Sequence, residues 1–276
     1  MNTRAGSGGS VPALSEPLRA PKGRWSDLSL RAASALVLAP LALFCLWRGG
    51  LAWELFLAAA LAGLGHEWGR LAGLRQGWAL PLCLLIAWAA AIWAGPPAGL
   101  LALLALTLAA WPVYGGFAAL GLPYAGLAGL AMLWLRARPE YGLAETGYLI
   151  LVIWGTDIGA YAVGRLLGGA KLAPRISPGK TWSGALGGLG IGAGCGAAAA
   201  LAAQAAPVAA FCTGLLLSMV AQAGDLLESA IKRKLGVKDS GRTIPGHGGL
   251  FDRLDGFLTA APVAALLTLA MQGGLG

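Results

Sequence analysis

Long apolar stretches recur along almost the whole chain and are separated only by short polar segments. A helix needs roughly 20 apolar residues to cross the hydrocarbon core of a bilayer. Charged residues make up 12% of the chain and mean hydropathy is +0.70, whereas about a quarter of the residues of a soluble domain are charged. The sequence therefore predicts an all-α, polytopic integral membrane protein.

Nine of these stretches are long and apolar enough to be interpreted as transmembrane helices. They lie near 32–47, 51–65, 78–94, 97–117, 121–135, 146–164, 184–204, 207–224 and 257–274. The break within 97–135 can fall at Pro112, Gly115, Gly116 or Gly121. Residues 1–27 are polar and rich in Ser, Gly and Pro, so we expect a disordered tail. The remainder, 28–276, is predicted to form one transmembrane domain.

The distribution of Lys and Arg predicts the orientation. With nine spans and a cytoplasmic N-terminus, 17 of the 20 basic residues lie in cytoplasmic segments. The three on the outer side of the membrane are Arg48, Arg136 and Arg138. This asymmetry follows the positive-inside rule. The formal charge of +8 then indicates a basic cytoplasmic face suited to anionic lipid headgroups or phosphorylated substrates. No pattern of basic and aromatic residues indicates a nucleic-acid partner.

Acidic residues gather near the end of the chain. Asp225, Glu228, Asp239, Asp252 and Asp255 account for five of the twelve, although burying one at a helix centre costs about 2.5 to 3.5 kcal/mol on insertion scales. Asp225 and Glu228 share a helical face with Lys232 and Arg233, because these residues follow at i+3, i+7 and i+8. The pattern places acids and bases together.

Two further segments carry groups suited to phosphate. Asp157, Tyr161 and Arg165 recur every four residues, and the following KLAPRISPGKT supplies Lys180 beside a Pro-Gly turn. This is not the GxxxxGK[ST] phosphate loop. In the run IPGHGGLFDRLDG, glycines allow close approach of a ligand to the backbone. Asp252 and Asp255, three residues apart, point the same way if a helix has begun.

Carboxylates facing several Lys and Arg suggest a hard divalent cation bound beside a polyphosphate. Oxygen ligands suit Mg²⁺, which commonly shares substrate phosphates. The two histidines, His66 and His247, and four scattered cysteines make a zinc site a poor alternative. The residues by themselves predict metal-assisted phosphate chemistry at the cytoplasmic membrane surface.

The stretch from Ser229 to Asp255, SAIKRKLGVKDSGRTIPGHGGLFDRLD, resembles the signature of the phosphatidate cytidylyltransferases, or CDP-diacylglycerol synthases. Further similarity lies in DIGAYAVGR (157–165), ISPGKT (176–181) and HEW (66–68), so that the resemblance covers roughly 28–275. Ser183 departs from the family pattern, because many members carry Glu there.

The resemblance implies that the phosphate of phosphatidic acid attacks the α-phosphorus of CTP, giving CDP-diacylglycerol and pyrophosphate for phospholipid biosynthesis. It implies a catalytic part at 150–256 that faces the cytoplasm from a bacterial-type inner membrane. The expected partners are CTP, phosphatidic acid and membrane lipid, and helix packing allows a homodimer.

By resemblance and spacing, the candidate ligands for Mg²⁺, and for a second cation if one binds, are Asp225, Asp252, Asp157 and Glu228. The catalytic candidates are Asp225, Asp252, Asp255, Lys232 and Arg233. The candidates for holding nucleotide and phosphate are Lys180, Lys238, Asp239, His247, Gly248, Gly249 and Arg253. Glu67 is expected to form a surface pair near Arg70, although its place in the HEW segment that resembles the family leaves its role open.

Two alternatives have similar hydropathy. A transporter for an anionic solute commonly shows internal repeats and charges at the bilayer midplane, and neither is evident here. A CTP-dependent lipid kinase would share the site but transfer a phosphate to an alcohol.

Overall fold

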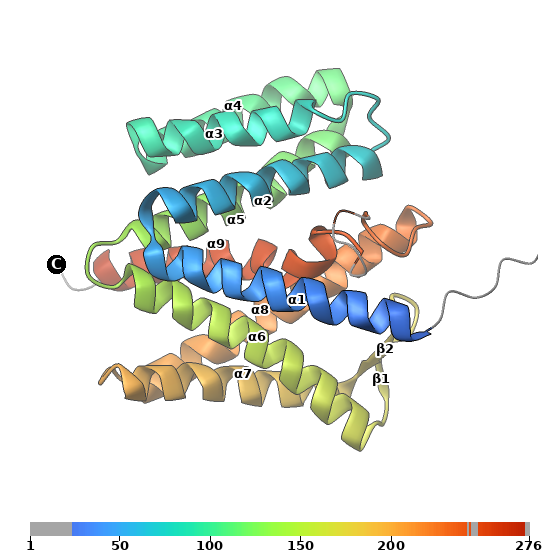
Figure 1. Cartoon of the computed structure of the whole chain (residues 1–276), viewed down its shortest axis with the longest axis vertical. Coiled ribbons are helices and arrows are strands. Elements are labelled where there is room, and N and C mark those ends of the chain that lie inside the picture. The colour runs from blue at the N-terminus through green and yellow to red at the C-terminus, as the bar shows by residue number, and fades with distance from the viewer. Residues whose placement is uncertain (1–23, 242, 244–247, 274–276) are drawn as a thin grey trace, which may run out of the picture.

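The computed structural model describes residues 24–241, 243 and 248–273, and within these ranges side chains from 36 to 271. The described chain forms nine α-helices and one β-hairpin (Figure 1). In order they are α1 (Arg24–Arg48), α2 (Gly50–Leu71), α3 (Ala79–Ala94), α4 (Pro96–Tyr114), α5 (Gly116–Ala137), α6 (Gly142–Leu167), β1 (Lys171–Ala173), β2 (Ser177–Thr181), α7 (Trp182–Ala202), α8 (Pro207–Lys234) and α9 (Phe251–Gly273).

Each predicted apolar stretch corresponds to one helix, except that 97–117 also includes the first two residues of α5, and several helices are longer than predicted. The eighth stretch was placed at 207–224, whereas α8 continues without a break to Lys234. This extension carries the predicted acidic and basic face on the same rigid helix as an apolar segment. The uncertain break within 97–135 falls at Gly115, while Pro112 and Pro123 lie inside α4 and α5.

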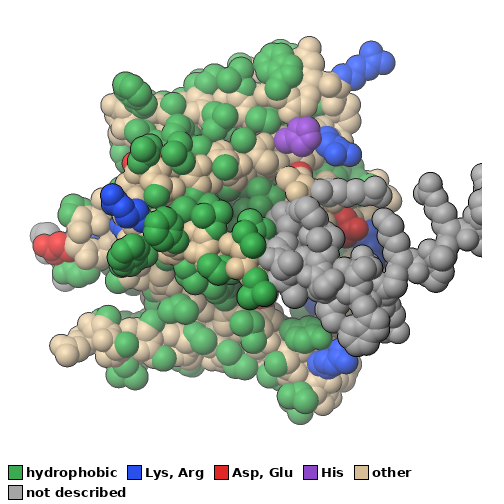
Figure 2. Space-filling model, in the orientation of Figure 1, with side chains coloured by type: hydrophobic (Ala, Val, Ile, Leu, Met, Phe, Trp, Pro, Cys, Tyr) green, Lys and Arg blue, Asp and Glu red, His purple; other side chains and the backbone are tan. Residues whose placement is uncertain are grey.

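Among the helices that the structure describes, six, α4 to α9, are long and apolar enough to cross a membrane. Shorter apolar segments occur in α1 (Leu36–Arg48) and α3, and α2 carries Glu54 and Glu67. Apolar side chains spread over the visible face, with charged side chains gathered toward the two ends (Figure 2). These features fit a multi-pass, all-α membrane protein. Nine crossings and a cytoplasmic N-terminus stay predictions.

Successive helices run in alternating directions. The α2–α3 loop, the β-hairpin and the segment between α8 and α9 therefore lie at one end of the molecule, on the right in Figure 1. The α1–α2 and α5–α6 connections lie at the opposite end. Segments far apart in sequence thus meet where the candidate site residues occur.

α5 is the most enclosed of the candidate membrane-spanning helices and packs against α2, α3, α4, α6 and α9. Near the site end, the rings of Trp68, Phe117, Tyr124 and Phe251 stack or tilt against one another at centroid distances of 5.0 to 5.9 Å. The indole of Trp68 also donates to the carbonyl of Phe117 at 3.0 Å. This aromatic cluster joins α2, α5 and the start of α9 into one body.

Candidate active site

Lys232 of α8 lies between two acidic side chains. Its ammonium donates to Asp252 Oδ1 of α9 at 2.5 Å and lies 3.2 Å from Glu228 Oε1, one helical turn away. Among the described residues, neither oxygen of the buried Glu228 carboxylate accepts a hydrogen bond. The Lys232 contact to Glu228 is thus an ion pair by distance alone. The arrangement leaves a buried carboxylate with unused ligand capacity.

The second oxygen of Asp252 organises the segment before α9. Asp252 Oδ2 accepts from the backbone and hydroxyl of Ser240, each at 3.1 Å, and from the backbone amide of Gly249 at 2.9 Å. A Cβ at Gly249 would fall 1.9 Å from Ser240 Oγ, so glycine is required for this close approach. Asp252 also lies in the first turn of α9, where a negative charge is favoured.

Glu67 of α2 was expected at the surface beside Arg70, and this prediction is wrong. Glu67 is 1% exposed and accepts hydrogen bonds from the Ser240 hydroxyl at 3.1 Å and from the Thr243 hydroxyl. It also accepts from the backbone amides that begin α9, Leu250 at 2.7 Å and Phe251 at 2.9 Å. These partners lie more than 170 residues away, so helical spacing around Glu67 could not reveal them.

A second acidic group surrounds Asp225 of α8. Lys180 of β2 forms an ion pair with Asp225, and the Ser229 hydroxyl donates to it at 3.4 Å. Asp157 of α6 and Asp255 of α9 both lie within electrostatic interaction range of Asp225. Asp255 also interacts with Glu228. The carboxylates of α6, α8 and α9 therefore converge, with a lysine against each part of the group.

The segment KLAPRISPGKT, in which only a Pro-Gly turn was predicted, forms the β-hairpin that carries Lys180. β1 and β2 pair antiparallel, with Lys171 opposite Thr181. Thr181 then caps α7, because its hydroxyl accepts from the Gly184 amide at 3.1 Å, as Ser and Thr do at helix N-termini. Ser183, where many family members carry Glu, donates its hydroxyl to the Gly168 carbonyl. These contacts hold Lys180 at the start of α7.

The remaining candidates lie around this centre. Arg233 is exposed and donates to the Ile176 carbonyl of the hairpin turn at 3.2 Å. Arg253 is exposed and interacts electrostatically with Asp157, while Lys238 and Asp239 are exposed. Gly248 lies beside Asp252, since a Cβ there would be 3.1 Å from Asp252 Oδ2. His247 lies outside the described residues.

Among the residues that the structure describes, no group of three or more His, Cys, Asp or Glu side chains is arranged to hold a metal ion. The predicted ligands form two neighbouring sets, Asp225 with Asp157 and Glu228 with Asp252, with Lys180 and Lys232 lying against them. The donors nevertheless fit Mg²⁺ chemically, because they are carboxylate oxygens and those of Glu228 lack hydrogen-bond donors within the described part of the chain. The ligand assignment stays a prediction.

Comparison with known proteins decides the family. The sequence profile of the cytidylyltransferase family matches residues 29–271, a range that includes every described site residue. The chain belongs to the cytidylyltransferase family. This cytidylyltransferase is 40% identical over 257 residues to the phosphatidate cytidylyltransferase of Brucella suis, covering 87% of this chain and 93% of that protein.

Two further relatives have the same name. The cytidylyltransferase is 41% identical over 276 residues to the phosphatidate cytidylyltransferase of Pseudomonas aeruginosa, covering 90% and 99% of the two chains. It is 44% identical over 150 residues to that of Bacillus subtilis, covering 53% and 55%. The family resemblance predicted from the signature between Ser229 and Asp255 is confirmed.

Proposed function

We propose that this cytidylyltransferase transfers CMP from CTP to phosphatidic acid in phospholipid biosynthesis. A phosphate oxygen of phosphatidic acid forms a bond to the α-phosphorus of CTP while the bond to the β-phosphate breaks, releasing pyrophosphate and CDP-diacylglycerol. The observation that carries the proposal is the convergence of Lys180, Lys232 and a carboxylate group at one end of a membrane protein of this family.

In this proposal, basic side chains hold and align the two anionic substrates. Phosphoryl transfer depends mostly on positioning and charge stabilisation, and phosphatidic acid needs no strong base to act as a nucleophile. Lys180, 27% exposed, and Lys232, 14% exposed, are assigned to phosphate oxygens. The exposed Arg233, Lys238 and Arg253 extend this positive surface. Asp239, Gly248, Gly249 and His247 are assigned to the nucleotide.

We assign Mg²⁺ as the cofactor, and we propose that the same carboxylates hold a second cation if one binds. Asp225, Asp252, Asp157 and Glu228 would hold the metal, with Asp255 in support. When bound, Mg²⁺ supplies charge neutralisation and alignment at the phosphates. The second oxygen of Glu228, Oε2, supports this assignment because it accepts no hydrogen bond within the described part of the chain. Lys180 pairs with Asp225, and Lys232 pairs with Asp252.

The site is assigned to the cytoplasmic side of a bacterial inner membrane, with nine crossings and a cytoplasmic N-terminus. The positive-inside rule supports this orientation, because Lys180, Lys232 and Arg253 belong to the segments rich in Lys and Arg that the rule places in the cytoplasm. The assignment of 150–256 as catalytic part is extended to include Glu67, which lies on α2. Membrane lipid is a further proposed partner, and a homodimer is the proposed assembly.

The decisive experiment supplies the purified protein with phosphatidic acid, Mg²⁺ and CTP labelled on either the α- or the γ-phosphate. We expect the α-label in a liponucleotide and the γ-label in pyrophosphate. A γ-labelled lipid without cytidine would favour the lipid kinase. Absence of any reaction, with uptake of an anionic solute into vesicles, would favour the transporter.

A residue test targets Asp252. Asp252→Asn keeps the size of the side chain but removes the charge that faces Lys232. We expect turnover to be abolished while the protein remains folded in the membrane, measured by the same assay together with gel filtration in detergent. Near-normal activity would refute the assignment of Asp252.

A further inference from the structure

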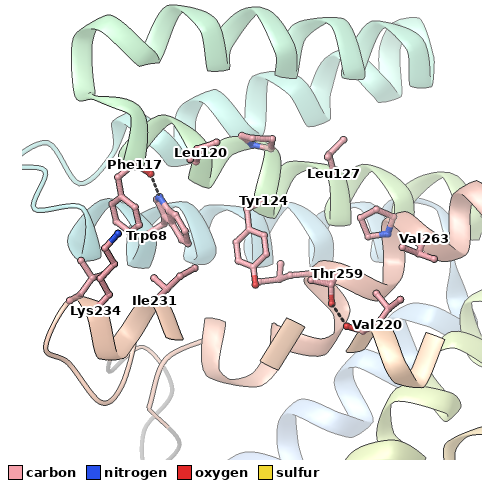
Figure 3. A pocket seen from close by; sticks show the side chains of 14 residues that line it. Trp68, Phe117, Leu120, Tyr124, Leu127, Val220, Ile231, Lys234, Thr259 and Val263 are labelled. Atoms are coloured by element: carbon pink, nitrogen blue, oxygen red, sulfur yellow. Dashed lines mark hydrogen bonds between the residues drawn. The ribbon is translucent and has the colours of Figure 1, made fainter. Parts of the chain in front are cut away.

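An apolar groove with a volume of about 870 Å³ lies between α5 and α8, which both pack against α9. This volume falls within the roughly 300 to 1,000 Å³ typical of small-molecule sites. Trp68 and Phe117 form one end, Tyr124 lies in the middle, and Val220 and Val263 lie toward the other end (Figure 3). The groove differs from the carboxylate group described above, because apolar side chains form most of its walls.

The groove has a charged end and an apolar end. Lys234, the last residue of α8, lies beside Trp68 and Phe117 (Figure 3). The separation of Lys234 from Val220 along α8 corresponds to roughly 21 Å at a rise of 1.5 Å per residue. One leaflet of a hydrocarbon core about 30 Å thick has a comparable depth. The groove therefore runs along α8 from the site end into the apolar interior.

Tyr124 connects the groove to the site. Its ring lines the groove, and it lies within electrostatic range of Asp225, Glu228 and Asp255. Its hydroxyl is buried and has no hydrogen-bond partner among the described residues. By contrast, the Thr259 hydroxyl deeper in the groove is satisfied by the Val220 carbonyl at 3.0 Å. An unsatisfied hydroxyl halfway along an apolar groove is suited to a ligand with a polar group at that depth.

We propose that the groove holds one acyl chain of phosphatidic acid, with the glycerol phosphate at the Lys234 end and an ester oxygen near the Tyr124 hydroxyl. This inference rests on the proposed function and names where its lipid substrate lies. The ammonium of Lys234 matches the anionic headgroup, and the apolar walls match the chain. Because bilayer lipid is as apolar as the groove, binding of the acyl chain there adds little affinity. It fixes the position of the lipid and so aligns its phosphate for attack.

Narrowing the groove tests this placement. Leu127→Trp on α5 and Val220→Phe on α8 each add bulk to its lining. We expect the ratio of kcat/KM for dioleoyl to dibutyryl phosphatidic acid to fall by roughly tenfold or more, since a displaced long chain misaligns the phosphate. Leu216→Trp, an exposed position on α8 outside the groove, should keep the wild-type ratio. An unchanged ratio in both folded groove variants would overturn the inference.

A second measurement uses the unmodified protein, so it does not depend on the folding of variants. A phosphatidic acid with a diazirine at the end of one acyl chain is photolysed in phosphatidylcholine nanodiscs. We expect labelled peptides from α5 and α9, and competition by dioleoyl phosphatidic acid but not by added phosphatidylcholine. Equal labelling of α4 without competition would indicate bulk lipid and overturn the inference. Failure to form product from any phosphatidic acid would instead refute the proposed function.

Discussion

The buried carboxylate of Glu67 on α2 accepts a hydrogen bond from the backbone amide of Phe251, 2.9 Å away and 184 residues later in the sequence. The amides of a first helical turn have no partner within their own helix, and Glu67 satisfies those of Leu250 and Phe251 at the start of α9. The Ser240 hydroxyl lies 3.1 Å from both Glu67 Oε2 and Asp252 Oδ2, so the two carboxylates share its one proton. Glu67 thus positions Asp252 without being part of the helix that carries it.

We expect Glu67→Gln to lower both stability and turnover. A hydrogen bond to a charged group contributes about 1.5 to 3 kcal/mol, so losing the charge should cost at least that amount in the free energy of unfolding. Thermal unfolding in detergent and the liponucleotide assay provide the two measurements. The matched control is Glu54→Gln, a similar change on the same helix. Equal behaviour of the two variants would contradict a positioning role for Glu67.

Lys180→Met should weaken CTP binding. The substitution keeps an unbranched side chain but removes the charge that pairs with Asp225, leaving a partly buried carboxylate where triphosphate is proposed to lie. We expect the KM for CTP to rise by roughly tenfold or more, in line with about 1.5 to 3 kcal/mol for a charged hydrogen bond. The exposed Lys171 on β1 of the same hairpin supplies the control, Lys171→Met. A KM no different from that control would argue against the assignment of Lys180.

Gly224→Ala should push α8 away from α9 beside the site. A Cβ at Gly224 would lie 2.1 Å from Thr259 Oγ1 and 3.0 Å from the Asp255 carbonyl, and the Thr259 hydroxyl is bound to Val220. Overpacking of this kind costs about 1 to 3 kcal/mol. Because Asp225 adjoins Gly224, kcat should fall together with the unfolding temperature.

The control for this change is Gly190→Ala on α7, where an added Cβ meets nothing within 4 Å. Alanine is the better helix former by about 0.8 to 1.0 kcal/mol, so this variant should be as stable as the wild type or more so. Similar losses in the Gly224 and Gly190 variants would show that close contact between α8 and α9 is not the cause.

Removal of divalent cations with EDTA should abolish turnover, and added Mg²⁺ should restore it. Glu228→Gln removes a carboxylate whose oxygens lack a hydrogen-bond donor in the described part of the chain, so the Mg²⁺ concentration for half-maximal rate should increase. Rates are measured across a Mg²⁺ titration at saturating CTP. The exposed Glu140→Gln should leave the titration unchanged. An unchanged curve for Glu228→Gln would remove this residue from the proposed ligand set.

The positions of the helices along the chain follow closely from local sequence properties. Apolar stretches of spanning length are recognisable because lipid solvates only apolar side chains and internally bonded backbone. The acidic and basic face from Asp225 to Arg233 was also predictable, since helical spacing alone puts those residues together. The hairpin carrying Lys180 was missed, because its two short strands are satisfied only by pairing with each other.

What the sequence determined by itself was a multi-pass helical protein of the cytidylyltransferase family and the residue types of its site. Only the tertiary structure decided which of those residues touch: that Lys232 bridges Glu228 and Asp252, that Lys180 reaches Asp225, and that Glu67 is buried beneath α9. The physical reason is range. Hydropathy and helical periodicity act over neighbouring residues, whereas these contacts depend on how separate helices pack against one another.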